Sequence, residues 1–289
     1  MTEAAAILSD ACAQAGLDPT GATLIRAGEN TLYRLTGGVV ARITRPGQFA
    51  TAAKEIAVAA WLRSADIPVV EPVPHLHQPY AVSERGATFW VDLGHHQRAS
   101  TSDLAGLLRR VHSLPVPNEL ALPSLAPFIR IADRINGAPL PAADRNWLLS
   151  HLAQLQDRYD ALTTDLSTAV HGDAWSGNVA LTKSGPVLLD LERFAVGRPE
   201  WDLTSTAVDH ETFGTVTAPD WNTYCRTYGQ DVTSWEHYPT YRDVRELRKV
   251  SFALQIATER PEHTGQAIYR IRCIQGYHGP RPWAWRGVA

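Results

Sequence analysis

The stretch VHGDAWSGNVALTKSGPVLLDLE, residues 170–192, decides how this chain is interpreted. Two short apolar runs, VALT and PVLLD, stand on either side of Lys183, Ser184 and Gly185, which are typical of a tight turn. The pattern predicts a β-hairpin. Polar residues gather in the loop before the hairpin and at its far end, so the hairpin would act as a rigid scaffold for them.

The spacing of these polar residues favours phosphoryl-transfer chemistry. Asp173 and Asn178 are five residues apart, and the returning hairpin would bring the carboxylate of Asp190 beside Asn178. One amide oxygen and one carboxylate suit a divalent cation whose other ligands are water and phosphate. Asp173 would stand free of the metal and accept a proton from a substrate hydroxyl, as in the catalytic loop of kinases. The alternative is that these acids form an ordinary solvated loop.

The first third of the chain is expected to be rich in β-strands. Five short runs with β-branched or aromatic residues are separated by glycines or turns: ATLIRAG, TLYRLTGG, VVARITR, YAVSERG and ATFWVDLG. One helical segment, TAAKEIAVAAWLRSAD, lies between the third and fourth runs. The predicted order is therefore β-β-β-α-β-β, preceded by a short amphipathic helix at the N-terminus.

Helical periodicity dominates after Gly94. Apolar residues recur at helical spacing in TSDLAGLLRRVHSL, ADRNWLLSHLAQLQDRYDAL, DVRELRKVSFALQIATE and TGQAIYRIRCIQGY. We expect a boundary near residues 92–96, with a small β-rich lobe at 1–92 and a larger, mostly helical lobe at 93–289. The predicted fold class is α+β, with an antiparallel β lobe that carries one helix.

Composition narrows the class of protein. The chain has 289 residues, 44% of them hydrophobic, so a sizeable core is expected. A net charge of −3 gives no electrostatic footprint for nucleic acid. Three widely spaced cysteines and the absence of a membrane-length apolar run favour a reduced, cytoplasmic protein with no membrane partner. A monomer or a weak dimer is expected.

The motif around Asp173 and the segment after it resemble those of a known family. HGDAWSGN, followed by VLLDLERFAVGRPEWDL, is similar to the aminoglycoside phosphotransferase and choline kinase-like family of small-molecule kinases. The resemblance covers most of the chain and includes the helix at 107–114. It implies a bilobal, protein-kinase-like fold, in which the lobe at 1–92 binds the nucleotide and the lobe at 93–289 carries catalysis and substrate binding.

The resemblance also implies roles for individual residues. Asp173 would be the catalytic base that orients the acceptor hydroxyl. Asn178 and Asp190 would bind Mg²⁺ that bridges the phosphates of ATP, with GTP as an alternative. His171 would brace the catalytic loop through hydrogen bonds, and Asp202 would accept backbone donors from that loop as a structural strut.

In the small lobe the resemblance implies a nucleotide site with departures from protein kinases. The turn at 28–31, with Asn30 and Thr31, would cover the phosphates, although one glycine makes it equally typical of a plain hairpin turn. Arg42 would stand where protein kinases use a lysine, and Glu55 on the following helix would pair with it. The alternative is that Arg42 and Glu55 are exposed surface residues.

The hinge and the acceptor site are the least defined parts. Backbone groups at 90–93, including Asp92 and Leu93, would read a purine edge, with adenine and guanine left open. Candidate substrate-binding residues are acidic or aromatic: Trp175, Glu192, Asp209 and Glu211. Glu192 lies two residues past Asp190, on the same side of an extended chain, so it would touch metal or substrate.

The predicted function is Mg²⁺-dependent transfer of a γ-phosphate to a hydroxyl of a small molecule. Aminoglycosides need acidic clusters, choline-like cations prefer aromatic cages, and sugars need mixed polar groups. Acids and tryptophans occur in comparable number here, so an aminoglycoside, an amino sugar and an amino alcohol all stay open. The alternative class is a nucleotide-binding module that has lost turnover, which Arg42 and the glycine-poor turn favour.

Overall fold

The computed structural model describes residues 3–28, 30–162 and 168–288. Glu29, in the turn expected to cover the phosphates, lies outside the described residues. The residues pack into two compact units, the first formed by Met1–Leu122 and Ser176–Phe194 and the second by Pro123–Trp175 and Ala195–Ala289. The expected lobes at 1–92 and 93–289 divide the chain at other residues and stay a prediction.

The first unit is built on a five-stranded antiparallel sheet with the strand order β1-β2-β3-β5-β4. Its elements are α1 (Glu3–Ala15), β1 (Thr23–Ala27), β2 (Thr31–Leu35), β3 (Val39–Ile43), α2 (Phe49–Ser64), β4 (Tyr80–Val82) and β5 (Arg85–Val91). The order β-β-β-α-β-β predicted from the sequence is confirmed, as is the N-terminal helix.

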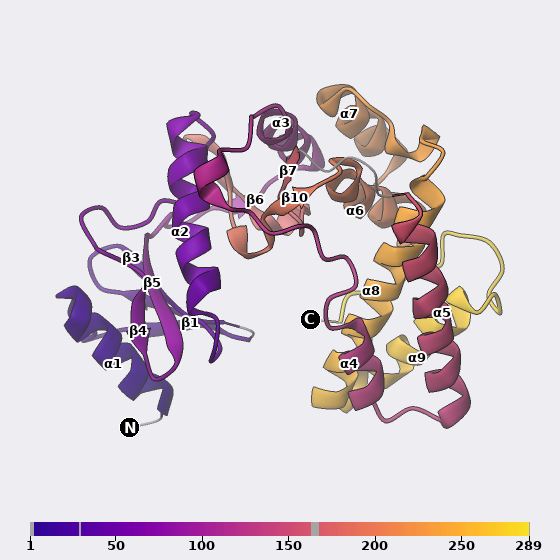
Figure 1. The fold of residues 1–289 in the computed structure, drawn as a ribbon, viewed down its shortest axis with the longest axis horizontal. Helices are drawn as coiled ribbons and strands as arrows, with labels where there is room; N and C mark the ends of the chain where they lie inside the picture. The colour runs from indigo at the N-terminus through magenta and orange to yellow at the C-terminus, as the bar shows by residue number, and fades with distance from the viewer. Residues whose placement is uncertain (1–2, 29, 163–167, 289) are drawn as a thin grey trace. The chain divides into compact units, whose positions relative to one another are not determined.

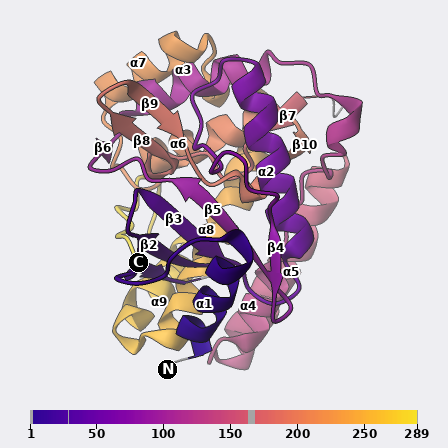
Figure 2. The ribbon, with the colours of Figure 1, turned by 90° about the vertical axis from the view of Figure 1, so that its left-hand side faces the viewer.

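Helices α1 and α2 lie on opposite faces of this sheet, because side chains alternate between the two faces along each strand (Figures 1 and 2). Ala41 and Phe89, which are paired in the register of β3 and β5, belong to the same buried cluster as Ile7 and Leu8 of α1. Arg42, the next residue along β3, therefore points to the other face, where α2 lies. This alternation is the reason why a charged residue in β3 can reach helix α2.

The predicted hairpin is also part of the first unit. Strands β6 (Gln97–Arg98), β8 (Val179–Thr182) and β9 (Gly185–Leu188) form an antiparallel sheet in the order β6-β8-β9. Helix α3 (Thr101–His112) follows β6 and begins with a capping box between Ser100 and Asp103. Short 3-10 turns lie at η1 (Asn118–Leu120), η2 (Ser176–Asn178) and η3 (Leu191–Arg193).

The second unit is mainly helical. Its elements are α4 (Ile131–Gly137), α5 (Ala142–Asp160), β7 (Thr168–Val170), β10 (Ala195–Gly197), α6 (Glu200–Glu211), α7 (Ala218–Tyr228), η4 (Val232–Ser234), α8 (Tyr238–Glu259), η5 (Pro261–His263) and α9 (Thr264–Ile274). Helix α8 packs against α4, α5, α6 and α9 and is the centre of this unit (Figure 1). Strands β7 and β10 pair antiparallel, which brings the chain before the catalytic loop beside the chain that leads into α6.

The described elements confirm the α+β class, with an antiparallel sheet in the first unit and a helical second unit. Within the described parts of the chain, none of the helices combines the length and the apolar character that a bilayer crossing requires.

Candidate functional site

The hairpin of β8 and β9 determines where the two predicted metal ligands stand in the chain. Val179 pairs with Leu188, and the backbone N–H of Leu189 donates to the carbonyl of Asn178 at 2.9 Å. Asp190 is therefore the residue directly after the one bonded to Asn178. Its φ of 56° is in the left-handed region, which is unusual for a residue other than glycine. Such strain is typical of functional positions held by their surroundings.

Arg42 is surrounded by three carboxylates of the first unit. Its Nη1 lies 2.5 Å from Oε1 of Glu55, and its Nη2 lies 2.9 Å from Oε2 of Glu192 and 3.6 Å from Oδ1 of Asp190. Burial acts to lower the pKa of Arg42, but the three carboxylates outweigh burial and raise it. Arg42 therefore stays charged, and its planar fork joins β3 to α2 and to the segment after β9 at once.

Glu55 is the most deeply buried member of this cluster. Burial raises its pKa to about 7, against the opposing effect of Arg42. Its second carboxylate oxygen, Oε2, is buried and has no hydrogen-bond partner among the described residues. The pairing of Arg42 with Glu55 that the sequence predicted is present, and the alternative of two exposed surface residues is wrong.

Glu192 links the turn before β2 to this cluster. Its Oε2 accepts hydrogen bonds from Nδ2 of Asn30 at 3.0 Å and from Arg42. The carboxylate of Glu192 therefore holds the turn at Asn30 against β3. A role at metal or substrate, as expected from its spacing to Asp190, stays a prediction.

Lys54 makes two long-range hydrogen bonds that were not predicted from the sequence. Its Nζ donates to the backbone carbonyls of Glu192 at 2.8 Å and Phe194 at 2.9 Å. Helix α2 thus reaches the segment after Asp190 through Lys54 and reaches β3 through Glu55. The only sequence signal was the scarcity of lysine, since Lys54, Lys183 and Lys249 are the three in the chain.

The catalytic loop belongs to the second unit up to Trp175, and it is braced from α6. The carboxylate of Asp202 accepts the backbone N–H of His171 at 2.7 Å and that of Gly172 at 2.9 Å. Nε1 of Trp201 donates to the carbonyl of Gly172 at 2.9 Å. Three buried hydrogen bonds therefore hold the backbone just before Asp173, in line with the strut that was expected at Asp202.

His171 is fully buried and acts inside the loop. Its Nδ1 accepts the backbone N–H of Asp173 at 3.3 Å, so a neutral ring would carry its proton on Nε2. The bond ties the ring to the backbone of the residue expected to be the base. This is the bracing that the sequence suggested for His171.

Asp173 itself combines an anchored backbone with an accessible side chain. The side chain is 46% exposed, and its Oδ1 lies 3.9 Å from Nη1 of Arg245. Arg245 is buried in α8, and sequence reasoning did not identify it. A signal was present, because Arg245 follows Tyr241 by four residues and so takes an inward position on the helix.

Two backbone N–H groups of the predicted hinge already donate hydrogen bonds within the first unit. The N–H of Val91 donates to the carbonyl of Glu71, and the N–H of Asp92 donates to the carbonyl of Gly38, both at 2.8 Å. The carboxylate of Asp92 accepts from Nε of Arg34 at 2.7 Å. A purine edge would therefore use other groups, such as the backbone carbonyl of Asp92 or the backbone of Leu93, and the role of both residues stays a prediction.

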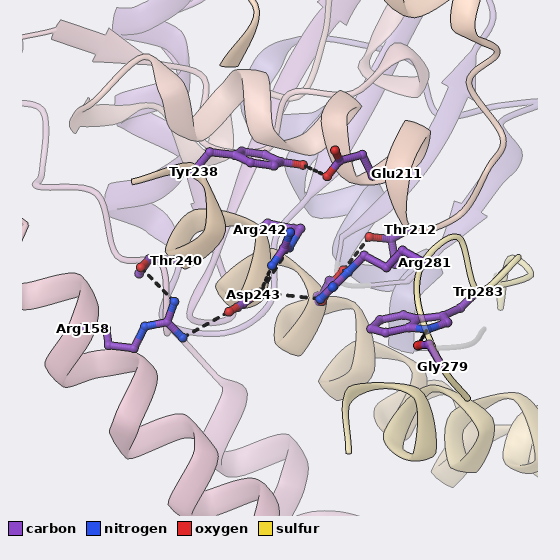
Figure 3. A network of polar contacts seen from close by, with 11 residues as sticks. Arg158, Glu211, Thr212, Tyr238, Thr240, Arg242, Asp243, Gly279, Arg281 and Trp283 are labelled. Atoms are coloured by element: carbon purple, nitrogen blue, oxygen red, sulfur yellow. Dashed lines mark hydrogen bonds and ion pairs between the residues drawn. The ribbon is translucent and has the colours of Figure 1, made fainter. Parts of the chain in front are cut away.

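Of the expected acceptor-binding residues, Glu192 lies in the first unit and the other three lie in the second unit. Trp175 is 37% exposed, Asp209 lies in α6, and Oε2 of Glu211 accepts the hydroxyl of Tyr238 at 2.7 Å (Figure 3). Glu211 is thus already hydrogen-bonded within its own unit. Thr31, expected at the phosphates, is the first residue of β2 and pairs with Ile43.

The donor set of the first unit fits a magnesium ion. One oxygen each from Glu55, Asp190 and Glu192 lie within 4.8 Å of one another. Asn178 directly precedes strand β8 of the hairpin, and Asp190 follows strand β9. Carboxylate and amide oxygens are the hard ligands that Mg²⁺ prefers. Arg42 offsets only part of the negative charge, so a divalent cation would complete the neutralisation.

Comparison with known proteins identifies the family. Residues 22–247 match the model of the Phosphotransferase enzyme family, so the chain belongs to this family. No curated protein matches the chain.

Solved structures share the fold at low identity. An amicoumacin kinase in complex with AMP-PNP and Ca²⁺ has a TM-score of 0.75 and 13% identity, covering 95% of this chain and 93% of that one. A choline/ethanolamine kinase family protein from Mesorhizobium loti has a TM-score of 0.63 and 18% identity, covering 94% of each chain. A spectinomycin phosphotransferase in complex with ADP and spectinomycin has a TM-score of 0.63 and 12% identity, covering 90% of each. The fold is therefore protein-kinase-like.

Proposed function

We propose that the protein transfers the γ-phosphate of ATP or GTP to a hydroxyl group of a small molecule, with Mg²⁺ as the required cation. The observation that carries the proposal is that Asp173 has an anchored backbone and an exposed carboxylate. Its backbone is held by the bonds of His171 and Gly172 to Asp202, while its carboxylate is about half exposed. A rigidly mounted, accessible carboxylate is what a residue needs to orient a hydroxyl for attack.

In this reaction Asp173 accepts the proton of the acceptor hydroxyl. The acceptor oxygen forms a new bond to the γ-phosphorus, and the bond from that phosphorus to the β–γ bridging oxygen breaks. The nucleoside diphosphate leaves with the electron pair of that bond. Because the transition state is loose, most of the catalysis would come from positioning and electrostatics.

The residues of the first unit would bind the nucleotide and its cation. Asn178 and Asp190 would hold Mg²⁺, which when bound supplies positive charge to the phosphate oxygens. Arg42, kept charged by Glu55, would add positive charge at the phosphates. Asn30, held by Glu192, and the neighbouring Thr31 would cover the phosphates, with Leu93 beside the base.

The ligands of the related structures support a proposal for the nucleotide and for the class of acceptor. The amicoumacin kinase was solved with AMP-PNP, Ca²⁺ and Ami, and the spectinomycin phosphotransferase was solved with ADP and its small substrate spectinomycin. We propose an acceptor of that size with at least one hydroxyl, and Trp175, Asp209 and Glu211 as residues near it. The family membership of the chain supports phosphotransfer, and the acceptor is to be found by experiment.

The decisive experiment is an acceptor screen. Purified protein would be incubated with Mg²⁺ and either ATP or GTP, together with amino sugars, aminoglycosides, amino alcohols, sugars or nucleosides. Nucleotide consumption and the mass of the product would be followed together. A phosphorylated product 80 Da heavier than the acceptor, roughly the mass of one added HPO₃ group, would support the proposal.

The matched variant is Asp173→Asn, which removes the base and preserves size. We expect kcat to fall by about 10²–10⁴-fold, while nucleotide binding measured by calorimetry changes little. Turnover that survives in Asp173→Asn would contradict the role of the base. Nucleotide binding without transfer to any acceptor, in both the wild-type protein and the variant, would instead favour the non-catalytic binding module.

A further inference from the structure

Arg245 is a buried cation directly beneath the catalytic loop. It lies in α8 and is 2% exposed, at a position where an apolar residue would be expected from the helix pattern. Burying a guanidinium has a substantial desolvation cost unless nearby groups offset it. Burial does lower the pKa of Arg245, and Asp173, Asp202 and Asp209 act in the opposite direction. The fold therefore buries a guanidinium at a desolvation cost, and we ask what the charge of Arg245 does there.

Contacts on two sides fix the plane of the guanidinium. Its carbon lies 3.8 Å from the centre of the Trp201 ring, in a close cation–π contact, and Nη2 donates to the carbonyl of Trp201 at 3.0 Å. Trp201 in turn donates to the carbonyl of Gly172. Arg245, Trp201 and the catalytic loop are thus one packed stack, and Nη1 is the end of the fork that is directed toward Asp173.

The distance between Arg245 and Asp173 is compatible with a role of Asp173 as a base. Nη1 lies 3.9 Å from Oδ1 of Asp173, within ion-pair range and beyond hydrogen-bond range. A direct hydrogen bond would occupy a lone pair that the base needs for the incoming proton. A charge at this distance attracts the carboxylate of Asp173 without a direct hydrogen bond from Nη1.

Asp202 also acts on the charge of Arg245, but its carboxylate is engaged by the backbone of the loop. Both of its carboxylate oxygens accept backbone N–H groups, from His171 and Gly172. Asp202 therefore acts on the backbone of the loop, whereas Arg245 acts on the side chain of Asp173. The two residues have separate effects on the same loop.

We propose that Arg245 is a positioning residue that orients and electrostatically holds the carboxylate of Asp173 for the proposed phosphotransfer. The inference rests on the proposed role of Asp173 as the base. Arg245 touches neither substrate nor nucleotide in this scheme, and it acts through Asp173 alone.

The test compares Arg245→Lys with Arg245→Met. Both variants remove the planar fork and its contact with Trp201, but only lysine keeps the positive charge. We expect Arg245→Met to lower kcat by about 30-fold or more, with the nucleotide dissociation constant from calorimetry within about twofold of wild type. Arg245→Lys should recover most of the lost kcat. Equal kcat in the two variants, or no loss in Arg245→Met, would overturn the proposal in favour of plain packing.

Arg248→Met is the matched control. Arg248 lies on the same helix and its guanidinium carbon is 5.7 Å from the same Trp201 ring, while its Nη1 donates to the carbonyl of Pro127. We expect its kcat to stay within about twofold of wild type. A loss equal to that of Arg245→Met would show that the ring contact matters and the charge beside Asp173 does not.

The double variant Asp173→Asn with Arg245→Lys separates failure of this inference from failure of the proposed function. The comparison can be made even if Arg245→Met does not fold. If Asp173→Asn retains full turnover, the proposed base is wrong. If Asp173→Asn is nearly inactive, the loss of kcat that remains in Arg245→Lys relative to the wild-type protein should disappear in the Asp173→Asn background. An equal effect in both backgrounds would contradict a role exerted through Asp173.

Discussion

At the scale of the single residue, Arg42 is an arginine at the predicted phosphate site, where protein kinases use a lysine. A lysine presents one compact charge, whereas the guanidinium of Arg42 reaches Glu55 with one nitrogen and Glu192 and Asp190 with the other. The arginine therefore connects two segments that a lysine would contact one at a time. The consequence is that the local structure around the predicted phosphate site depends on the fork.

Arg42→Lys is expected to weaken nucleotide binding more than it slows chemistry. Lysine keeps the charge but cannot hold Glu55 and Glu192 together, so the turn at Asn30 loses its anchor. We expect the KM for nucleotide to rise roughly tenfold, about 1.4 kcal/mol, with a smaller change in kcat. Steady-state kinetics with the acceptor identified in the screen would measure both. An unchanged KM would mean that the point charge alone suffices.

At the scale of the element, helix α2 contacts β3, β5 and the segment after Asp190 within the first unit. Gly86 of β5 permits this helix to lie close to the sheet, since a Cβ added at Gly86 would come within 2.9 Å of the Cβ of Ala52. From that close position Glu55 reaches β3, and Lys54 reaches the backbone after Asp190. Displacement of α2 would therefore disturb Arg42 and Asp190 together.

Lys54→Met tests the link from α2 to the segment that carries Asp190. Loss of two charge-assisted hydrogen bonds would release backbone that follows a residue in left-handed conformation. We expect the Mg²⁺ concentration needed for half-maximal nucleotide binding to rise about tenfold, measured by calorimetry in a magnesium titration. This readout does not depend on turnover.

Lys183→Met serves as the control for charge, because Lys183 is exposed in the turn between β8 and β9 of the same hairpin. It should leave the magnesium titration unchanged. If both lysine variants shift the titration equally, a general loss of positive charge is responsible and the contact of Lys54 is not.

At the scale of the whole molecule, the C-terminal segment is part of the core of the second unit. Trp283, Trp285 and Val288 are buried in the same cluster as residues of α5 and α8. Arg281 contacts Oε1 and Oε2 of the buried Glu246 at 2.6 Å each, and its guanidinium carbon lies 4.4 Å from the centre of the Trp283 ring (Figure 3). Residues 281–288 therefore contribute to the stability of the helical unit.

Arg281→Met should destabilise the fold because it leaves Glu246 buried without its cation. Thr212 would remain as a donor to Glu246, at 2.5 Å, but a hydroxyl offsets only part of the charge. Because Arg281 is partly exposed, we expect a loss of about 2–4 kcal/mol in the free energy of unfolding, near the lower end for a broken buried ion pair. Urea denaturation would measure it.

The double variant Arg281→Met with Glu246→Met is the control for this pair. Removing both charges leaves no unpaired group, so the double variant should be more stable than Arg281→Met alone. Strictly additive losses would show that Glu246 and Arg281 do not interact, contrary to the structure.

Local pattern in the sequence was sufficient for the elements of the small sheet, the central hairpin and four of the later helices, whereas α4, α6 and α7 were not predicted. The β8–β9 hairpin and the order β-β-β-α-β-β were predicted, because alternation, helical periodicity and turn residues act over a few positions. The pairing of Arg42 with Glu55 was instead implied by the family resemblance. The contacts of Asp202 with the catalytic loop are likewise those expected from the motif that contains it.

Only the tertiary structure revealed the contributions of Lys54 and Arg245 and the bonds that already engage the amides of Val91 and Asp92. Lys54 and Glu192 are 138 residues apart, and Arg245 is 72 residues from Asp173. No local pattern links such positions, since their contacts arise when packed helices bring distant side chains together. The sequence by itself therefore determined the chemistry present in the motif, and the packing of α2 and α8 decided which other charges act on it.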